Sequence, residues 1–458
     1  QTRSCSAAFF ANATYSYKGR YTVNGTARYE GTNRMGKSRS ARWLPTWNVS
    51  GAWNAHEEKF FSNLTSVLSH FTLKASYSLT ADRGPADVTN SQAIITSYSP
   101  YRPFTSIQES GLYIKELENS ELTYEKKHEL NIGADMGFLN NRINLAVDWY
   151  KRNNYDLIGI VNTQGAGGQI LKYANIASMK SHGIEFTLST KNIKTKDFNW
   201  NTDFIFSNAK NEVTDLKQNA NVMELISGNG FAKQGYPVRG LFSIPFVGLD
   251  KDGIPVIINE KGEATSTDIN FQERQNTGFL KYEGPTDPTI TGSLGNMFSY
   301  KGFRLNLFIT YSFGNVIRLN PVFKAYYSDL TAMTREFKNR WTLPGDETKT
   351  NVPAILSKRM YDSNEDLKYA YNAYNYSTER IAKGDFIRLK EISLAYDFPK
   401  AWINPLKLTD LSLKVQATNL FLIYADDKLN GQDPEFFNAG GVASPVPRQF
   451  TITLRLGL

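Results

Sequence analysis

Strict alternation of apolar and polar residues is the dominant pattern in this chain. In residues 142–151, Ile143, Val147 and Trp149 lie on one side of the alternation and Asp148 on the other. Successive side chains of a β-strand point to opposite faces, so the pattern predicts a strand with one apolar and one polar face. Thirteen such strands are predicted, at residues 7–17, 21–29, 46–54, 71–79, 129–138, 142–151, 183–190, 198–207, 290–300, 303–311, 385–398, 411–418 and 449–458.

The connections between these predicted strands alternate between short and long. Tight turns are predicted at residues 18–20, 139–141 and 301–302, whereas very long loops are predicted at 208–289 and 314–384. Shorter versions of the long loops include 30–45, 152–182 and 419–448. Most of the strands have the length of roughly 9–11 residues that crosses a bilayer at a tilt. Alternating short turns and long loops are typical of outer-membrane β-barrels, whose long loops are extracellular.

Aromatic residues gather near the ends of the predicted strands. Barrels carry such aromatic girdles at both membrane interfaces, where an amphipathic ring has an apolar and a wet neighbour. The alternative at this point is a soluble β-rich protein with many aromatic residues. The aromatic residues near strand ends are Tyr15, Tyr17, Tyr21, Trp47, Trp53, Trp149, Phe198, Trp200, Tyr300, Phe303, Tyr311, Tyr396 and Phe398.

Composition and charge narrow the classes of protein. The 458 residues are 41% apolar and 13% aromatic, without a run near the roughly 18 apolar residues of a membrane-spanning helix. The net charge of +8 is spread along the chain without a basic arm or stripe, which argues against binding to nucleic acid. Cys5 is the single cysteine, so an internal disulfide is excluded.

The sequence carries no catalytic constellation, so we expect that the protein is not an enzyme. The four histidines are scattered and lack the spacing of a metal-binding helix. Residues 250–253 and 259–262 are turn sequences that flank an apolar run, which predicts a small hairpin inside a long loop. Asp250 and Asp252 are close enough to suggest a loop Ca²⁺ site, although their spacing departs from an EF-hand. We otherwise expect no cofactor.

The polar strand faces and the long loops are the candidate functional surfaces. Charges on a lipid-facing position near the bilayer centre cost about 2–4 kcal/mol for Arg or Lys, so charged strand residues should face the lumen. Packing on other parts of the protein is the alternative for each. The lumen-facing candidates are Arg142, Asp148, Glu185, Asp203, Arg304 and Lys414. The loop candidates for contact with substrate or partner are Tyr326, Tyr327, Trp341, Tyr374, Asp433 and Glu435, which could equally pack within the loops.

Several segments resemble the barrel of SusC/RagA-type TonB-dependent transporters of the Bacteroidetes. The resemblance starts from "NIGADMGFLNNRINLAVDWYKRNNYDLI" and "YANIASMKSHGIEFTLS", a strand pair and the opening of the next strand. It continues with "YSYKGRYTVNGTARYEGTNRMG", "GDFIRLKEISLAYDFPK", "QATNLFLI" followed by "GQDPE", and the final "PVPRQFTITLRLGL". These segments occur in the family's order over nearly the whole chain. One departure is the final residue, Leu458, where outer-membrane barrels commonly end in an aromatic residue.

The resemblance implies a fold and a function. Residues 1–458 would form the C-terminal part of a transmembrane antiparallel β-barrel, about 13 of roughly 22 strands. We expect the plug domain and the N-terminal strands to lie outside this chain, either in a separate nicked polypeptide or in a longer one. The implied function is TonB-dependent import of large nutrients, oligosaccharides or peptides, across the outer membrane of a Gram-negative, Bacteroidetes-like bacterium. The implied partners are a SusD-like surface lipoprotein, TonB acting through the plug, and the lipid bilayer.

Two other functions remain open from the sequence. One is a siderophore- or cobalamin-type TonB-dependent receptor, which the SusC-like segments disfavour. The other is a soluble β-rich glycan-binding protein or adhesin, which would not need detergent to stay in solution.

Overall fold

The computed structural model describes residues 4–84, 93–101, 109–163, 165, 171–321, 335–437 and 447–457. The chain divides into two compact units. Unit 1 comprises Gln1–Phe186 and Ala209–Gln218, and unit 2 comprises Thr187–Asn208 and Asn219–Leu458. Within the described residues, no helix has both the length and the apolar character needed to cross a membrane.

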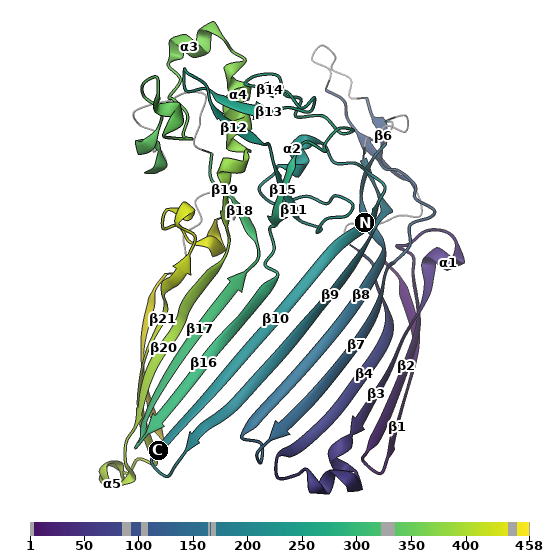
Figure 1. Cartoon of the computed structure of the whole chain (residues 1–458). Helices are drawn as coiled ribbons and strands as arrows, with labels where there is room; N and C mark the ends of the chain where they lie inside the picture. The colour runs from purple at the N-terminus through teal and green to yellow at the C-terminus, as the bar shows by residue number, and fades with distance from the viewer. Residues whose placement is uncertain are drawn as a thin grey trace. The chain divides into compact units, whose positions relative to one another are not determined.

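One antiparallel sheet of 13 strands dominates the fold, and its strand order follows the chain order (Figure 1). Its strands are β1 (Ser6–Tyr17), β2 (Tyr21–Thr32), β3 (Trp43–Asn54), β4 (Leu68–Asp82), β7 (Glu125–Phe138), β8 (Ile143–Asn162), β9 (Leu171–Lys194), β10 (Phe198–Leu216), β16 (Ile290–Tyr300), β17 (Phe303–Phe313), β20 (Phe386–Asp397), β21 (Asp410–Ala425) and β22 (Gln449–Gly457). Each strand corresponds to one predicted strand, so the predicted all-β class and strand number are confirmed.

The strands of the β8–β9 hairpin are much longer than predicted. Residues 152–182 were expected to form a loop, but β8 continues to Asn162 and β9 starts at Leu171. The Asn175 side-chain amide fixes this extension by donating to the carbonyl oxygens of Asp156, at 2.6 Å, and Thr123, at 2.8 Å. Alternation marks only strands with one buried or lipid-facing side, so it cannot reveal an extension that projects away from such a surface.

Strand register in unit 1 separates an apolar from a polar face. Paired residues of an antiparallel sheet point to the same side, so a row of partners shows which face each residue occupies. One row across the sheet is largely apolar and the adjacent row is polar. The apolar row is Tyr15, Val23, Gly51, Ala75, Ile132 and Trp149, and the polar row is Thr14, Asn24, Ser50, Ser76, Asn131 and Tyr150.

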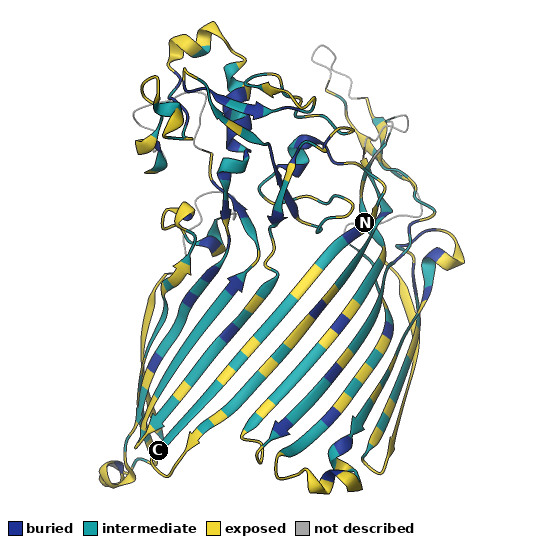
Figure 2. Cartoon of the chain, viewed as in Figure 1, coloured by how far each residue is buried: buried dark blue, intermediate teal, exposed yellow. Residues whose placement is uncertain are grey.

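Unit 2 shows the same separation of faces. Its apolar row is Trp200, Phe298, Leu305, Leu394, Val415 and Ile452, and its adjacent, largely polar row is Asn201, Met297, Asn306, Ser393, Gln416 and Thr451. Large apolar side chains remain exposed in this row, with Val415 at 48% and Ile452 at 75%. Along the strands in Figure 2, exposed and less exposed positions alternate. An exposed apolar surface of this extent indicates a face that is covered by something other than water.

The short connections are tight turns held by left-handed residues. Leu139, Asn140 and Asn141 all have φ between 52° and 58° in the β7–β8 turn. Asparagine tolerates this conformation well, whereas leucine does so rarely. Neighbouring residues hold this turn, because Leu139 N donates to Val67 O at 2.9 Å and Asn140 N to Ser69 Oγ at 2.7 Å.

The long connections of unit 1 carry small elements and a separate core. Met35, Leu44, Leu122 and Tyr124 are buried together and join the β2–β3 and β4–β7 connections. The small elements are α1 (Arg39–Arg42), β5 (Ile94–Tyr98) and β6 (Gly111–Glu116), and the β3–β4 turn adds the 3₁₀ helices η1 (Ala55–Glu57) and η2 (Lys59–Asn63).

The long connections of unit 2 fold into a lobe with its own core, here called the loop lobe and defined as residues 219–289 and 335–383. Its strands are β11 (Gly240–Ser243), β12 (Phe246–Leu249), β13 (Pro255–Ile258), β14 (Ala264–Thr265), β15 (Lys281–Pro285) and β19 (Ile381–Lys383), and β18 (Val316–Arg318) pairs with β19. Its helices are α2 (Val222–Leu225), α3 (Lys358–Ser363), α4 (Leu367–Asn375), η3 (Arg335–Asn339), η4 (Asp346–Thr348) and η5 (Thr378–Arg380). The β12–β13–β14 sheet includes the hairpin predicted around residues 250–262.

The loop lobe is held together by apolar clusters and a buried arginine. Val222, Phe242 and Ile257 belong to one fully buried cluster. Arg318, 6% exposed, donates to the carbonyl oxygens of Phe242 at 2.5 Å and Ser377 at 3.1 Å. Burial lowers the pKa of Arg318 to about 10, so the guanidinium keeps its charge at neutral pH. The remaining elements of unit 2 are α5 (Lys400–Ile403), η6 (Asn404–Leu406), η7 (Asp427–Leu429) and η8 (Pro434–Phe436).

Candidate functional site

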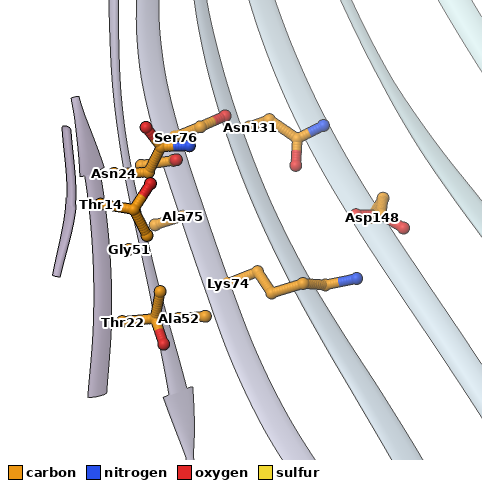
Figure 3. Close-up of a pocket in the computed structure, with 11 residues that line it drawn as sticks. Thr14, Thr22, Asn24, Gly51, Ala52, Lys74, Ala75, Ser76, Asn131 and Asp148 are labelled. Atoms are coloured by element: carbon orange, nitrogen blue, oxygen red, sulfur yellow. The ribbon is translucent and has the colours of Figure 1, made fainter. Parts of the chain in front are cut away.

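A polar hollow of about 430 Å³ lies on the polar face of unit 1 (Figure 3). Neighbouring strands contribute hydroxyl and amide side chains at the same level because strand pairing aligns them. These are Thr14, Asn24, Ser50, Ser76 and Asn131. Lys74 and Asp148 also line the hollow and bring charges to it. A surface of this kind offers hydrogen bonds to any hydroxyl-rich or peptide-like molecule.

A glycine lets the two charged side chains approach each other. Lys74 and Asp148 both pair with Gly133, on either side of it. A Cβ atom on Gly133 would come within 2.2 Å of Asp148 Oδ1, so only glycine leaves room for this carboxylate. Lys74 Nζ in turn lies 2.7 Å from Asp135 Oδ2. Sequence reasoning missed Gly133 because a glycine in a strand does not by itself show what lies over it.

Three predicted lumen-facing residues belong to unit 1, and the structure gives them different places. Asp148 lines the hollow with Lys74. Glu185 is an exposed residue of β9. Arg142 was expected on a strand but lies in the β7–β8 turn, where its N–H donates to Phe138 O at 2.9 Å. The turn therefore spans residues 139–142, one residue more than predicted, and β8 begins at Ile143.

The other three predicted lumen-facing residues lie in unit 2, and each has a polar partner. Asp203 accepts a hydrogen bond from Ser189 Oγ at 2.6 Å. Arg304 forms an ion pair with Asp397 at 2.8 Å, and Lys414 lies 3.8 Å from Glu391. Arg304 and Lys414 both pair with Ala395 and so share one face.

Some of the loop candidates pack in a core of the loop lobe, and others form hydrogen bonds or ion pairs. Tyr374 is 2% exposed and packs with Phe337, which favours the alternative of packing within the loop. Trp341 Nε1 donates to Glu347 Oε2 at 3.0 Å. Tyr326 and Tyr327 lie outside the described residues.

Asp433 and Glu435 bind a buried arginine that the sequence did not single out. Arg388 of β20, with a side chain 6% exposed, lies 2.5 Å from Asp433 and 2.8 Å from Glu435. This pairing joins the β21–β22 connection to the sheet. Arg388 and Asp433 belong to two of the quoted sequence segments, but they are 45 residues apart, and nothing in either segment indicates that they meet.

Two groups of three charges on the polar face of unit 1 also escaped sequence reasoning. Glu30 is paired with Arg28 and lies 4.0 Å from Arg83. Glu129 is paired with Lys127 at 2.8 Å and with Arg152 at 3.2 Å. The first group lines a second hollow of about 660 Å³. In both groups one carboxylate is shared by two cations.

Asp250, a candidate calcium ligand, is engaged with its own turn. Its Oδ1 atom accepts hydrogen bonds from the N–H groups of Asp252, at 2.9 Å, and Ile254, at 2.8 Å. In the described part of the chain, no group of three or more His, Cys, Asp or Glu side chains could hold a metal ion. The calcium site stays a hypothesis from the sequence.

Curated proteins that are similar to this chain are described as TonB-dependent receptors. SusC, a TonB-dependent receptor of Bacteroides thetaiotaomicron, is 26% identical over 484 residues, which cover 100% of this chain and 44% of SusC. TonB-dependent receptor P3 of Formosa agariphila is 25% identical over 446 residues, which cover 93% of this chain and 41% of the relative. The chain therefore spans less than half the length of these curated relatives.

The solved structures agree on the fold. The structure of the RagAB peptide transporter matches with a TM-score of 0.78 and 23% identity, over 99% of this chain and 47% of that one. The resemblance to SusC/RagA-type proteins is thereby confirmed. The family model described as "TonB dependent receptor-like, beta-barrel" matches residues 1–420. This chain belongs to the family of TonB-dependent receptor β-barrels.

Proposed function

We propose that this chain forms part of the wall of a TonB-dependent importer of large nutrients, oligosaccharides or peptides, in the outer membrane of a Gram-negative bacterium. The observation that carries the proposal is the two-faced, 13-stranded sheet. Its exposed apolar face suits lipid, and its polar face suits a wet lumen. Membership of the receptor family supports the same reading. No catalytic step is part of the proposal.

The partners follow from the relatives and from the long connections. We infer that a SusD-like surface lipoprotein covers the extracellular side and that TonB acts through a plug domain in the remainder of the transporter. The RagAB match and the similarity to SusC support this inference. The folded loop lobe supports it as well, because a lobe with its own core offers a well-ordered surface to which a lipoprotein can bind. The proposed lumen lining includes Asp148, Arg304 and Lys414.

Uptake in the source bacterium tests the function. Fluorescent oligosaccharides and peptides of increasing size should enter wild-type cells and fail to enter cells that lack this gene or TonB. Uptake that continues without TonB would contradict the proposal. Growth that depends on the gene only under iron limitation, and is restored by a siderophore, would instead favour the siderophore-type alternative.

A further inference from the structure

The second hollow on the polar face of unit 1 is rich in arginine; we call it the arginine hollow. It measures about 660 Å³ and is lined by Arg28, Arg34 and Arg83 together with Glu30 and Asp82. All five lie in described parts of the chain, on or beside β2 and β4. Guanidinium groups bind carboxylates and other oxyanions through parallel hydrogen bonds, which makes such a hollow a candidate anion site.

Charge sharing leaves Arg28 and Arg83 with unused binding capacity. Glu30, whose side chain is 12% exposed, is the shared partner of Arg28 and Arg83. One carboxylate carries one negative charge, so the group of three keeps a net positive charge. A guanidinium has five N–H donors and one carboxylate oxygen pair satisfies only some of them. Arg28 is also half exposed, at 51%, and so remains open to a ligand.

The polar-face positions of the strands add hydroxyl and amide side chains to the arginine hollow, and Leu79, Ala81 and Gly84 also line it. Thr26, Thr46, Thr80 and Asn48 also line it and offer three hydroxyls and an amide. Trp47 contributes to the lining, but it pairs with Leu79 and its ring packs on Tyr77 at 5.4 Å, on the apolar face. Hydroxyl and amide groups suit the hydroxyls of a sugar, whereas a peptide with apolar side chains would in addition need apolar pockets.

We propose that the arginine hollow binds the acidic groups of the imported molecule, and that this molecule is an acidic oligosaccharide bearing carboxylates or sulfates. This inference rests on the proposed import function and names the substrate class. Arg28 and Arg83 bind the anionic groups, while the threonines and Asn48 bind neighbouring sugar hydroxyls. Glu30 orients the two arginines and weakens their hold on the anion, so that the substrate can leave.

Binding to the purified full-length transporter in detergent tests the proposal. The probes are hexagalacturonate, a sulfated hexasaccharide, the neutral maltohexaose and hexaglutamate, measured by calorimetry at low and high salt. Wild-type protein should bind at least one acidic oligosaccharide, more weakly at high salt. The double variant Arg28→Gln with Arg83→Gln should lose about tenfold or more in affinity, since each charge-assisted hydrogen bond contributes strongly. Equal or tighter binding of maltohexaose or hexaglutamate would overturn the proposed substrate class.

Glu30→Gln separates binding from a structural role. If the arginines bind the ligand, removal of the shared carboxylate should raise the affinity for the acidic oligosaccharide. If the group only holds the fold together, Glu30→Gln should reduce binding as the double variant does, and that result would overturn the proposal. Arg20→Gln is the matched control, because Arg20 also pairs with a carboxylate, Glu58, at 3.2 Å, at the short β1–β2 turn. Its affinity should stay within twofold of wild type.

Uptake assays keep this inference distinct from the proposed function. TonB-dependent uptake of a neutral oligosaccharide or a peptide, without binding of either acidic oligosaccharide, would overturn the inference and leave the import function standing. If wild-type cells take up none of the tested oligosaccharides or peptides in a TonB-dependent way, the proposed function itself is overturned.

Discussion

At the scale of single residues, the polar face depends on small groups that fit closely. Gly133 is the clearest case, since its missing side chain is the space that Asp148 occupies. Asp148 and Lys74 face each other across this glycine, and the Asp135 carboxylate holds Lys74 in place. The charge pattern of the first hollow therefore depends on a residue without charge.

Gly133→Ala should displace Asp148 without unfolding the sheet. The new methyl group would need the position of the carboxylate, so the Asp148 side chain has to rotate. Overpacking of this kind costs about 1–3 kcal/mol. A crystal or cryo-EM structure of the variant should show the moved carboxylate, and the melting temperature should fall by a few degrees. Gly25→Ala is the control, because a Cβ there meets nothing within 4 Å; an unmoved Asp148 in Gly133→Ala would contradict the argument.

The Arg388 pairs should be unequal in strength. Arg388 and Asp433 are almost fully buried, whereas the Glu435 side chain is 37% exposed. Loss of one partner of a buried pair costs about 3–5 kcal/mol, whereas an exposed pair contributes about 0–1 kcal/mol. Asp433→Asn should therefore release the segment at residues 426–437, seen as much faster hydrogen exchange or proteolysis there. Glu435→Gln should change the rate little, and equal effects of the two variants would contradict this ranking.

The limits of sequence reasoning are clearest at this residue scale. Asp148, Arg304 and Lys414 were chosen as candidates because their charges fall on the polar positions of alternating strands. The partner of Asp433 was not identified, because a contact between distant segments leaves no periodic signal. Tyr374 illustrates a related limit, since an aromatic residue in a long loop has the same sequence signature whether it packs inside a lobe or contacts a ligand.

At the scale of elements, alternation identified every strand of the large sheet. The reason is physical, because one part of each of these strands has an apolar face and a polar face. The outer parts of β8 and β9 lack that contrast, and so their extension was missed. The loop lobe was missed for another reason. Its core comes from short segments, such as those around Val222 and Phe242, that have no period of their own.

Strand β8 offers a direct test of the two faces. Val147 pairs with Ala134 on the apolar face, and Asp148 pairs with Gly133 on the polar face. We expect oxygen dissolved in lipid to enhance the relaxation of a spin label at residue 147. A water-soluble nickel complex should instead enhance the relaxation of a label at residue 148. The protein should be labelled in liposomes, after Cys5 has been replaced by serine. The reverse accessibility would overturn the assignment of the faces.

Helix α4 offers a test of the loop lobe. Tyr371 is fully buried and its hydroxyl donates to Ala354 O at 2.7 Å. Burial raises the pKa of Tyr371, which keeps the hydroxyl protonated as a donor. Tyr371→Phe leaves that carbonyl without its partner and should destabilise the lobe by about 1–3 kcal/mol. Hydrogen exchange should accelerate in α4 and β13 and stay unchanged in β16 and β17.

Tyr369→Phe is the matched control for this prediction. Tyr369 lies on the same helix but is 38% exposed, so its hydroxyl can bind water when the helix forms. Exchange in this variant should match the wild type. Acceleration that spreads equally through the large sheet would show that the lobe does not have a stability of its own.

At the scale of the whole molecule, the proposed function requires that the exposed apolar rows meet the bilayer. In unit 2, Val415 lies in the apolar row and Gln416 in the polar row, one residue apart on β21. An arginine on the lipid face of a barrel costs about 2–4 kcal/mol near the bilayer centre, whereas an arginine on the lumen side can be hydrated. The same substitution at adjacent positions therefore distinguishes a membrane wall from a sheet covered by other protein.

Val415→Arg should reduce the assembly of the full-length transporter, and Gln416→Arg should not. Assembly is measured as the amount of protein in the outer membrane that resists carbonate extraction. Assembled protein is also recognised because its migration in gel electrophoresis changes on heating. About 1.4 kcal/mol corresponds to a tenfold change in an equilibrium constant. The cost of about 2–4 kcal/mol should therefore be visible when folding into lipid vesicles is titrated with urea. If both variants assemble equally well, Val415 does not face lipid. If Gln416→Arg alone fails, the two faces have to be exchanged, and Arg304 and Lys414 then lose their place in the proposed lumen.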